Sequence, residues 1–116
     1  MMKLAMSAAA AGLLRALLAR AGVDRNRILL SDFRSSDWNS LTFAGERHEI
    51  ALRIPGPGAM AVAALLIDGL EDADFVIPGQ IVADIAVARP PVDQADGAIT
   101  LAIEALTVPN ECSGVA

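Results

Sequence analysis

The chain has 116 residues, which suits one domain with a single core. Its net charge of −5 and its few aromatic residues (three Phe, one Trp, no Tyr) argue against nucleic-acid binding, which needs clustered cations and stacking platforms. One cysteine excludes an internal disulfide and a cysteine-rich zinc site, and a cytoplasmic location is expected. Apolar residues reach 54%, enough for a core and for an apolar patch that a partner covers.

The start of the chain predicts a helix rather than a targeting segment. Residues 1–14 have the lysine and the small residues of a signal peptide, but two arginines interrupt the apolar stretch that follows. No run reaches the ~20 apolar residues of a membrane span, so no membrane partner is expected. Residues 7–21 predict a helix with Ser7 as N-cap and Gly22 at its end. Its apolar stripe contains Ala10, Leu13, Leu14, Leu17, Leu18 and Ala21.

Two strands are predicted next. Residues 27–34 predict the first, with Asp32 and Arg34 on the face of Ile28 and Leu30, and with Phe33 on the other face. Residues 35–41 predict a polar loop that contains Trp38. Residues 42–54 predict a second strand, antiparallel to the first. One face of this strand carries Ala44, Glu46, His48, Ile50, Leu52 and Ile54.

The second half predicts a helix followed by strands. The segment Pro55–Gly58 ends the second strand and opens a helix over residues 59–68, which is apolar nearly all round and so predicts cover on more than one side. Residues 90–97 predict a polar loop, and residues 109–116 a disordered tail. Strands are predicted over residues 74–77, 80–88 (Ile81, Ala83, Ile85 and Val87 on one face) and 98–108 (Ile99, Leu101 and Ile103 inside).

This order of elements predicts one α+β domain over residues 1–108. Adjacent strands favour antiparallel pairing, and two helices would cover one face of a four- or five-stranded sheet. The nearest common architecture is a ferredoxin-like plait or a relative of it, because the leading helix makes the match imperfect.

The candidate ligand site gathers polar side chains at one end of the first two strands. His48 is either a general base or pH sensor, oriented by Glu46 or Asp32, or a half-buried histidine that holds the hairpin register; the second interpretation is favoured because no nucleophile motif accompanies it. Two interpretations of this cluster remain: it binds a small anion, or it forms a ladder of ion pairs on a solvent-exposed edge of the sheet. The ion-pair ladder is favoured. The members of the cluster are Asp32, Arg34, Trp38, Arg47 and His48. No metal or other cofactor is expected.

The sequence favours a non-enzymatic module that associates with itself, as a dimer, or with another protein. Met60 and Leu66 on the apolar second helix, and the lone Trp38, are the candidate interface residues. Residues 1–58 hold eight Lys/Arg and five Asp/Glu, whereas residues 59–116 hold one Lys/Arg and nine Asp/Glu. Either the charges of the two halves interleave on one surface, which is favoured, or a dipolar surface associates head-to-tail. The alternative function is an anionic-ligand-binding or weakly catalytic domain that uses Arg34, Arg47, His48 and Trp38.

Overall fold

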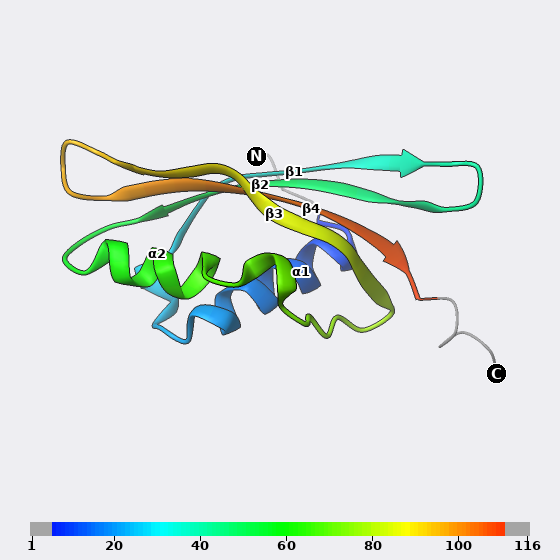
Figure 1. The fold of residues 1–116 in the computed structure, drawn as a ribbon, viewed down its shortest axis with the longest axis horizontal. Coiled ribbons are helices and arrows are strands. Elements are labelled where there is room, and N and C mark those ends of the chain that lie inside the picture. The colour runs from blue at the N-terminus through cyan, green and yellow to red at the C-terminus, as the bar shows by residue number, and fades with distance from the viewer. Residues whose placement is uncertain (1–5, 111–116) are drawn as a thin grey trace, which may run out of the picture.

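A computed structural model describes residues 6–110 as two α-helices and one four-stranded sheet (Figure 1). The α-helices are α1 (Ala8–Ala21) and α2 (Ala59–Ile67), and the strands are β1 (Leu29–Asn39), β2 (Ala44–Ile54), β3 (Gln80–Asp93) and β4 (Ile99–Pro109). Two 3₁₀ turns, η1 (Arg25–Arg27) and η2 (Leu70–Asp72), follow the α-helices. The predicted α+β class is confirmed. Most of the predicted tail (residues 111–116) and the first five residues of the suspected targeting segment lie outside the described residues.

Both helices begin and end where local sequence signals place them. The Ser7 hydroxyl accepts a hydrogen bond from the backbone N–H of Ala10 at 3.1 Å, which satisfies one of the free amides of the first turn of α1. Gly22 ends α1 in the left-handed conformation (φ +67°), which glycine adopts without the strain of a Cβ atom. Gly58 and Gly69 flank α2 in the same conformation.

The sheet is antiparallel throughout, with the order β1-β2-β4-β3. Read from β4 and continued through α1, the elements follow the β-α-β-β-α-β succession of the ferredoxin-like plait. The fold is therefore a relative of that plait in which the chain opens at a different connection. This difference explains why a helix comes first.

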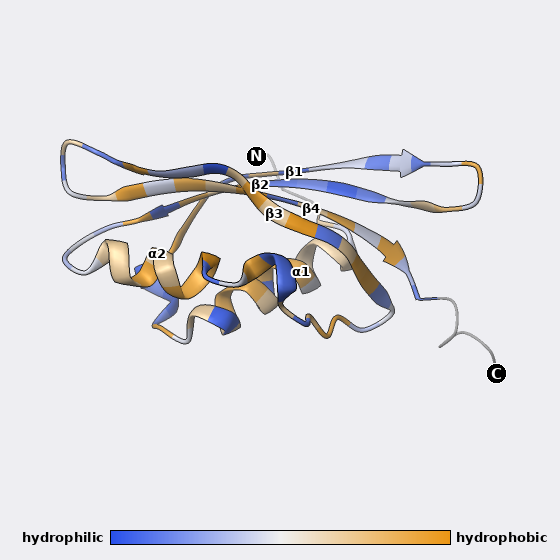
Figure 2. Cartoon of the chain, in the orientation of Figure 1, coloured by the Kyte–Doolittle hydropathy of each residue, from blue (hydrophilic) through white to orange (hydrophobic). Residues whose placement is uncertain are grey.

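One face of the sheet is covered by the helices and the other is open (Figure 1). The covered face presents the alternate residues of β2 and β4 that the two-residue period predicted, and Figure 2 shows hydrophobic colour along the helices that cover this face. The largest fully buried apolar side chains of the core are Leu13, Leu17, Ile50, Leu52, Ile54, Leu66, Leu70, Ile99 and Ile103.

β1 departs from the prediction in length and in the assignment of its faces. The strand continues through the predicted loop to Asn39, since residues 35–39 pair with the first residues of β2. A register shift between Leu30 and Asp32 inserts an extra residue, so Phe33 shares the covered face with Leu30, and Asp32 lies on the open face. The predicted grouping of Asp32 and Arg34 with Leu30 was wrong because a bulge reverses the alternation.

β3 departs from the prediction for a related reason. It runs on to Asp93 through two prolines that the sequence assigned to a loop, which an edge strand tolerates because its outer amides need no partner. A register shift between Val82 and Asp84 places Ile81 on the open face and Ile85 on the covered face, not together as predicted. The predicted strand over residues 74–77 is reduced to one bridge, between Ile77 and Gln80.

The charges of the two halves of the chain interleave, as the favoured interpretation expected. Arg47 of the basic half pairs with Glu104 of the acidic half at 2.9 Å, and Arg53 pairs with Asp96. Arg20 donates to the backbone carbonyls of Leu66 and Asp68 at the end of α2. The positive guanidinium of Arg20 thus complements the negative C-terminal end of the α2 dipole.

Candidate functional site

His48 lies on the covered face of β2, fully buried between β1 and β4. Its Nδ1 is 2.8 Å from the Ser35 hydroxyl, and its Nε2 is 2.9 Å from the Thr107 hydroxyl. Phe33 packs edge-on against the imidazole, with ring centroids 5.8 Å apart. The side chain of His48 therefore joins three neighbouring strands through hydrogen bonds on both of its ring nitrogens.

The environment of His48 favours the neutral imidazole. Burial lowers the pKa of His48 below its ordinary value, and the carboxylate of Glu46, 3.8 Å from Nε2, offsets part of that shift. A neutral imidazole has one donor and one acceptor, and each hydroxyl can serve as either, so both tautomers are fully hydrogen-bonded. These contacts match the interpretation in which His48 holds the register of the strands.

A further hydrogen bond connects Glu46, beside this cluster, to α1. The hydroxyl of Ser7 donates to Oε1 of Glu46 at 2.6 Å while it accepts from the Ala10 amide. The N-cap of α1 is thus attached to β2 beside His48. Ser7, Ser35 and Thr107 were not identified from the sequence as partners of His48, because nothing local marks residues that meet only after the strands pair.

The predicted ligand-site residues do not surround one cavity. His48 faces the helices, whereas Asp32, Arg34, Trp38 and Arg47 alternate with residues of the covered face and so lie on the open face. Arg34 pairs with Asp32 and Arg47 pairs with Glu104, both at 2.9 Å. Trp38, half-buried, lies opposite Gly45 in the register.

The open face holds a shallow charged basin over the middle of the sheet. Two arginines and three carboxylates line it, so it has no excess of positive charge to attract an anion. Its charged residues are Asp32, Arg34, Glu49, Arg89 and Glu104. Within residues 6–110 no group of three or more metal-binding side chains comes together, and no helix is both long enough and apolar enough to span a membrane.

The outer side of α2 is an exposed apolar surface. The side chains of Met60 and Leu65 are 56% and 50% exposed, so the helix is not covered all round within the described chain. Leu66, predicted as an interface residue, is instead completely buried in the core. Its neighbour Leu65 takes the outward position, because one residue turns a helix by about 100°.

The hairpin between β1 and β2 forms an arm that extends past the rest of the sheet (Figure 1). The last register pair between β2 and β4 is Glu46 with Thr107, so residues 38–45 lie beyond it and pair only with each other. At the tip, Leu41 is fully exposed and Phe43 is 60% exposed, and Figure 2 shows the tip in the hydrophobic colour. Neither residue was predicted from the sequence as a contact residue, although two apolar residues between polar strand ends are a visible signal.

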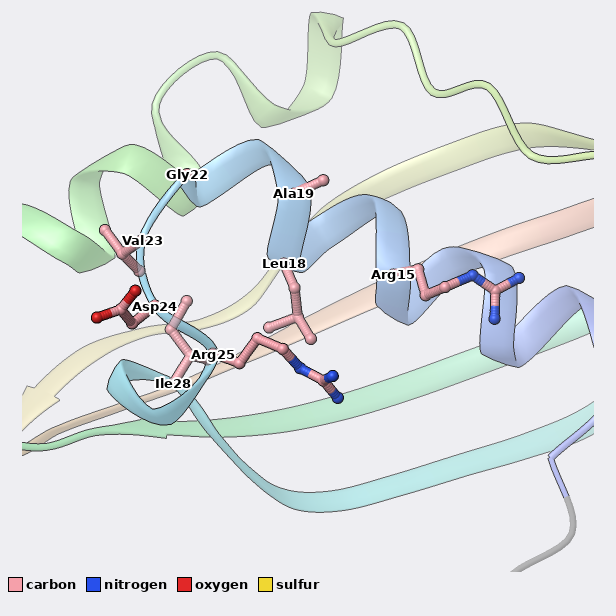
Figure 3. Close-up of a pocket in the computed structure, with 8 residues that line it drawn as sticks. All are labelled: Arg15, Leu18, Ala19, Gly22, Val23, Asp24, Arg25 and Ile28. Atoms are coloured by element: carbon pink, nitrogen blue, oxygen red, sulfur yellow. The ribbon is translucent and has the colours of Figure 1, made fainter.

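A mostly apolar groove of about 490 Å³ lies at the C-terminal end of α1 (Figure 3). Leu18, Val23 and Ile28 form its apolar wall, and Arg15, Asp24 and Arg25 are its charged lining residues. A second apolar hollow shares Leu18, Arg25 and Ile28 with the groove and reaches Leu30 at the start of β1. The two hollows together form a continuous apolar strip beside α1.

These features define an α+β protein with a satisfied buried polar cluster and several exposed apolar surfaces. Among solved structures, a similar chain belongs to the "Virion of native gene transfer agent (GTA) particle", with 17% sequence identity and a TM-score of 0.58. The similarity covers 88% of this chain and 99% of that one. At 17% sequence identity this similarity shows a shared fold and nothing more. No protein-family model matches the sequence, and no curated protein matches it.

Proposed function

We propose that this protein is a structural component of a particle of the gene transfer agent type, in which it assembles with further copies of itself. The observation that carries the proposal is the similarity of fold to a chain of such a virion over nearly the whole length of both. The predicted self-association is the part of this proposal that the sequence had already favoured.

The surface of the chain supports an assembling role. The α2 face and the arm tip expose large apolar side chains at separate places, and burying each such side chain against a partner is worth about 1.5–3 kcal/mol. The buried histidine has both nitrogens hydrogen-bonded inside the fold, so it offers no free base to a substrate. A non-enzymatic role fits both observations.

The molar mass of the purified full chain tests the proposal. Light scattering over a concentration series is expected to show species larger than the 12.0 kDa chain, with the dimer predicted from the sequence as the smallest. Replacing Met60 and Leu65 together by Gln is expected to weaken assembly if α2 lies in an interface. Val76→Ser, at a position that is 91% exposed, is the matched control. A monomer at every concentration would contradict the proposal.

The anionic-ligand function and the cytoplasmic location stay predictions. Both arginines of the predicted site already have carboxylate partners. A rise in melting temperature with inorganic phosphate that His48→Ala abolishes, in a variant that still folds, would favour the ligand function over the structural one.

A further inference from the structure

We propose that the tip of the β1–β2 arm, Leu41 and Phe43, inserts into the groove at the C-terminal end of α1 of a second copy of this chain. The inference rests on the proposed function, because it names the contact through which copies assemble. The partner is another identical chain, and the two copies use different surfaces at their contact.

The tip is ordered by its own hydrogen bonds. The hydroxyl of Ser40 accepts from the backbone N–H of Phe43 at 3.0 Å, and the backbone N–H of Ser40 donates to the carbonyl of Phe43 at 2.8 Å. These bonds hold the turn in shape without a partner, and Leu41 and Phe43 are left facing water. A turn already held in shape loses little conformational entropy on docking.

The groove is suited to receive those side chains. Figure 3 shows the apolar side chains of Leu18, Val23 and Ile28 around it, with the arginine side chains of Arg15 and Arg25 alongside. Its exposed lining is mainly apolar, in contrast to the charged basin on the open face of the sheet. Concave apolar surfaces with a few polar groups at the edge are the usual receptors for apolar anchors.

The tip and the groove lie at opposite ends of the molecule. The arm extends from one end of the sheet in Figure 1, and α1 ends toward the other, in a molecule whose longest extent is 50 Å. A tip therefore cannot reach the groove of its own chain. An interface between two different surfaces leaves one tip and one groove free in every pair, so assembly continues until it closes into a ring or extends as a filament.

Charge favours the same pairing. The arm begins after Asp37, an exposed carboxylate, and residues 38–45 carry no charge of either sign. The groove is lined by Arg15 and Arg25 against Asp24, which leaves it net positive. In the described part of the chain neither arginine forms an ion pair, and neither does Asp37. Opposite charges at the edges of a contact set its orientation and raise its rate of association.

The test mixes two variants of the full chain, each with one surface blocked. Leu41→Ser with Phe43→Ser removes the tip, and Ala19→Glu places a carboxylate in the groove at an exposed position of α1. Each variant alone is expected to need a concentration at least about tenfold higher than the unmodified chain to assemble. Mixed together, the intact groove of one and the intact tip of the other should give one-to-one complexes that grow no further, seen by light scattering.

A charge exchange provides an independent readout. Asp37→Arg and Arg25→Asp are each expected to weaken assembly, and the double exchange in one chain is expected to restore it. Val76→Ser with Val92→Ser, two exposed apolar residues elsewhere, is the control for loss of surface hydrophobicity. Unchanged melting temperatures confirm that the variants fold.

The outcomes separate the two proposals. An unmodified chain that stays monomeric overturns both. If the unmodified chain assembles and the variant without the tip assembles equally well, the arm contact alone is overturned. Loss of assembly in both variants without one-to-one complexes in the mixture overturns the pairing of the tip with this groove.

Discussion

The two ends of β2 lie in opposite environments although they belong to one strand. Ile50, Leu52 and Ile54 are at most 1% exposed beneath the helices, and the first two pair with both β1 and β4. At the other end Ala44 and Gly45 pair only with β1 and lead into a tip whose apolar side chains face water. An apolar side chain therefore contributes to folding where a third strand and a helix cover it, and is available to a partner where they do not.

The largest difference between the two regions is expected in their tolerance of truncation. Ile103→Ala, at a fully buried position of β4 next to β2, should reduce the free energy of unfolding by about 2–5 kcal/mol, from lost burial and a residual cavity. Leu41→Ala at the arm tip should change it by no more than about 0.5 kcal/mol. Urea unfolding of both variants measures this, at concentrations where the chain is monomeric. Equal losses would mean that the tip is part of the core.

The polar cluster at the base of the arm is expected to show the next effect. Thr107→Val keeps the volume of the side chain but leaves Nε2 of His48 buried without its partner, at a cost of about 1–3 kcal/mol. Ser36→Ala, at an exposed position of β1, is the control and should cost little. If the two variants unfold at the same urea concentration, the hydrogen bond to Thr107 does not stabilise the fold.

A smaller loss is expected at the N-cap of α1. Ser7→Ala removes both the bond from the Ala10 amide and the bond to Glu46, and should cost about 0.5–2 kcal/mol. Ser7→Thr retains a hydroxyl and should recover most of that loss. Thermal unfolding of the three proteins measures the order, and a threonine variant no better than alanine would exclude the capping explanation.

The mildest effect is expected from pH, because only one buried group is involved and Glu46 offsets part of its shift. The pKa of His48 is lower in the folded protein than its value of 6.5 in the unfolded chain, so the unfolded chain binds the proton first as pH falls. Stability should therefore be complete above about pH 6.5 and should decline below it, toward the folded pKa. His48→Gln should flatten this slope above about pH 5, where most carboxylates are still ionised. An identical slope in the variant would show that other groups cause it.

Much of the fold could be predicted from local patterns. The caps of α1, the extent of α2 and the alternation along β2 and β4 agree with the structure, because each depends on neighbours within a few residues. The faces of β1 and β3 were partly wrong, since single extra residues near Ser31 and Ala83 reverse the alternation without a mark in the sequence.

The candidate site could be predicted less well. His48 was found because a lone histidine stood on an otherwise apolar face, but its hydroxyl partners lie 13 and 59 residues away. The arm was missed because its exposure depends on where β4 ends, and the ligand cluster was proposed before it was known which face of the sheet each residue occupies.

The class of fold, the helices and their ends, and the buried stripe of β2 follow from the amino-acid sequence, since they depend on periodicity and local hydrogen bonding. The strand order, the partners of His48, the exposure of Leu65 in place of Leu66, and the distance between the arm tip and the α1 groove depend on the folded chain. Strand pairing and helix packing bring together residues far apart along the chain, and the period of a segment gives no information about its neighbours in space.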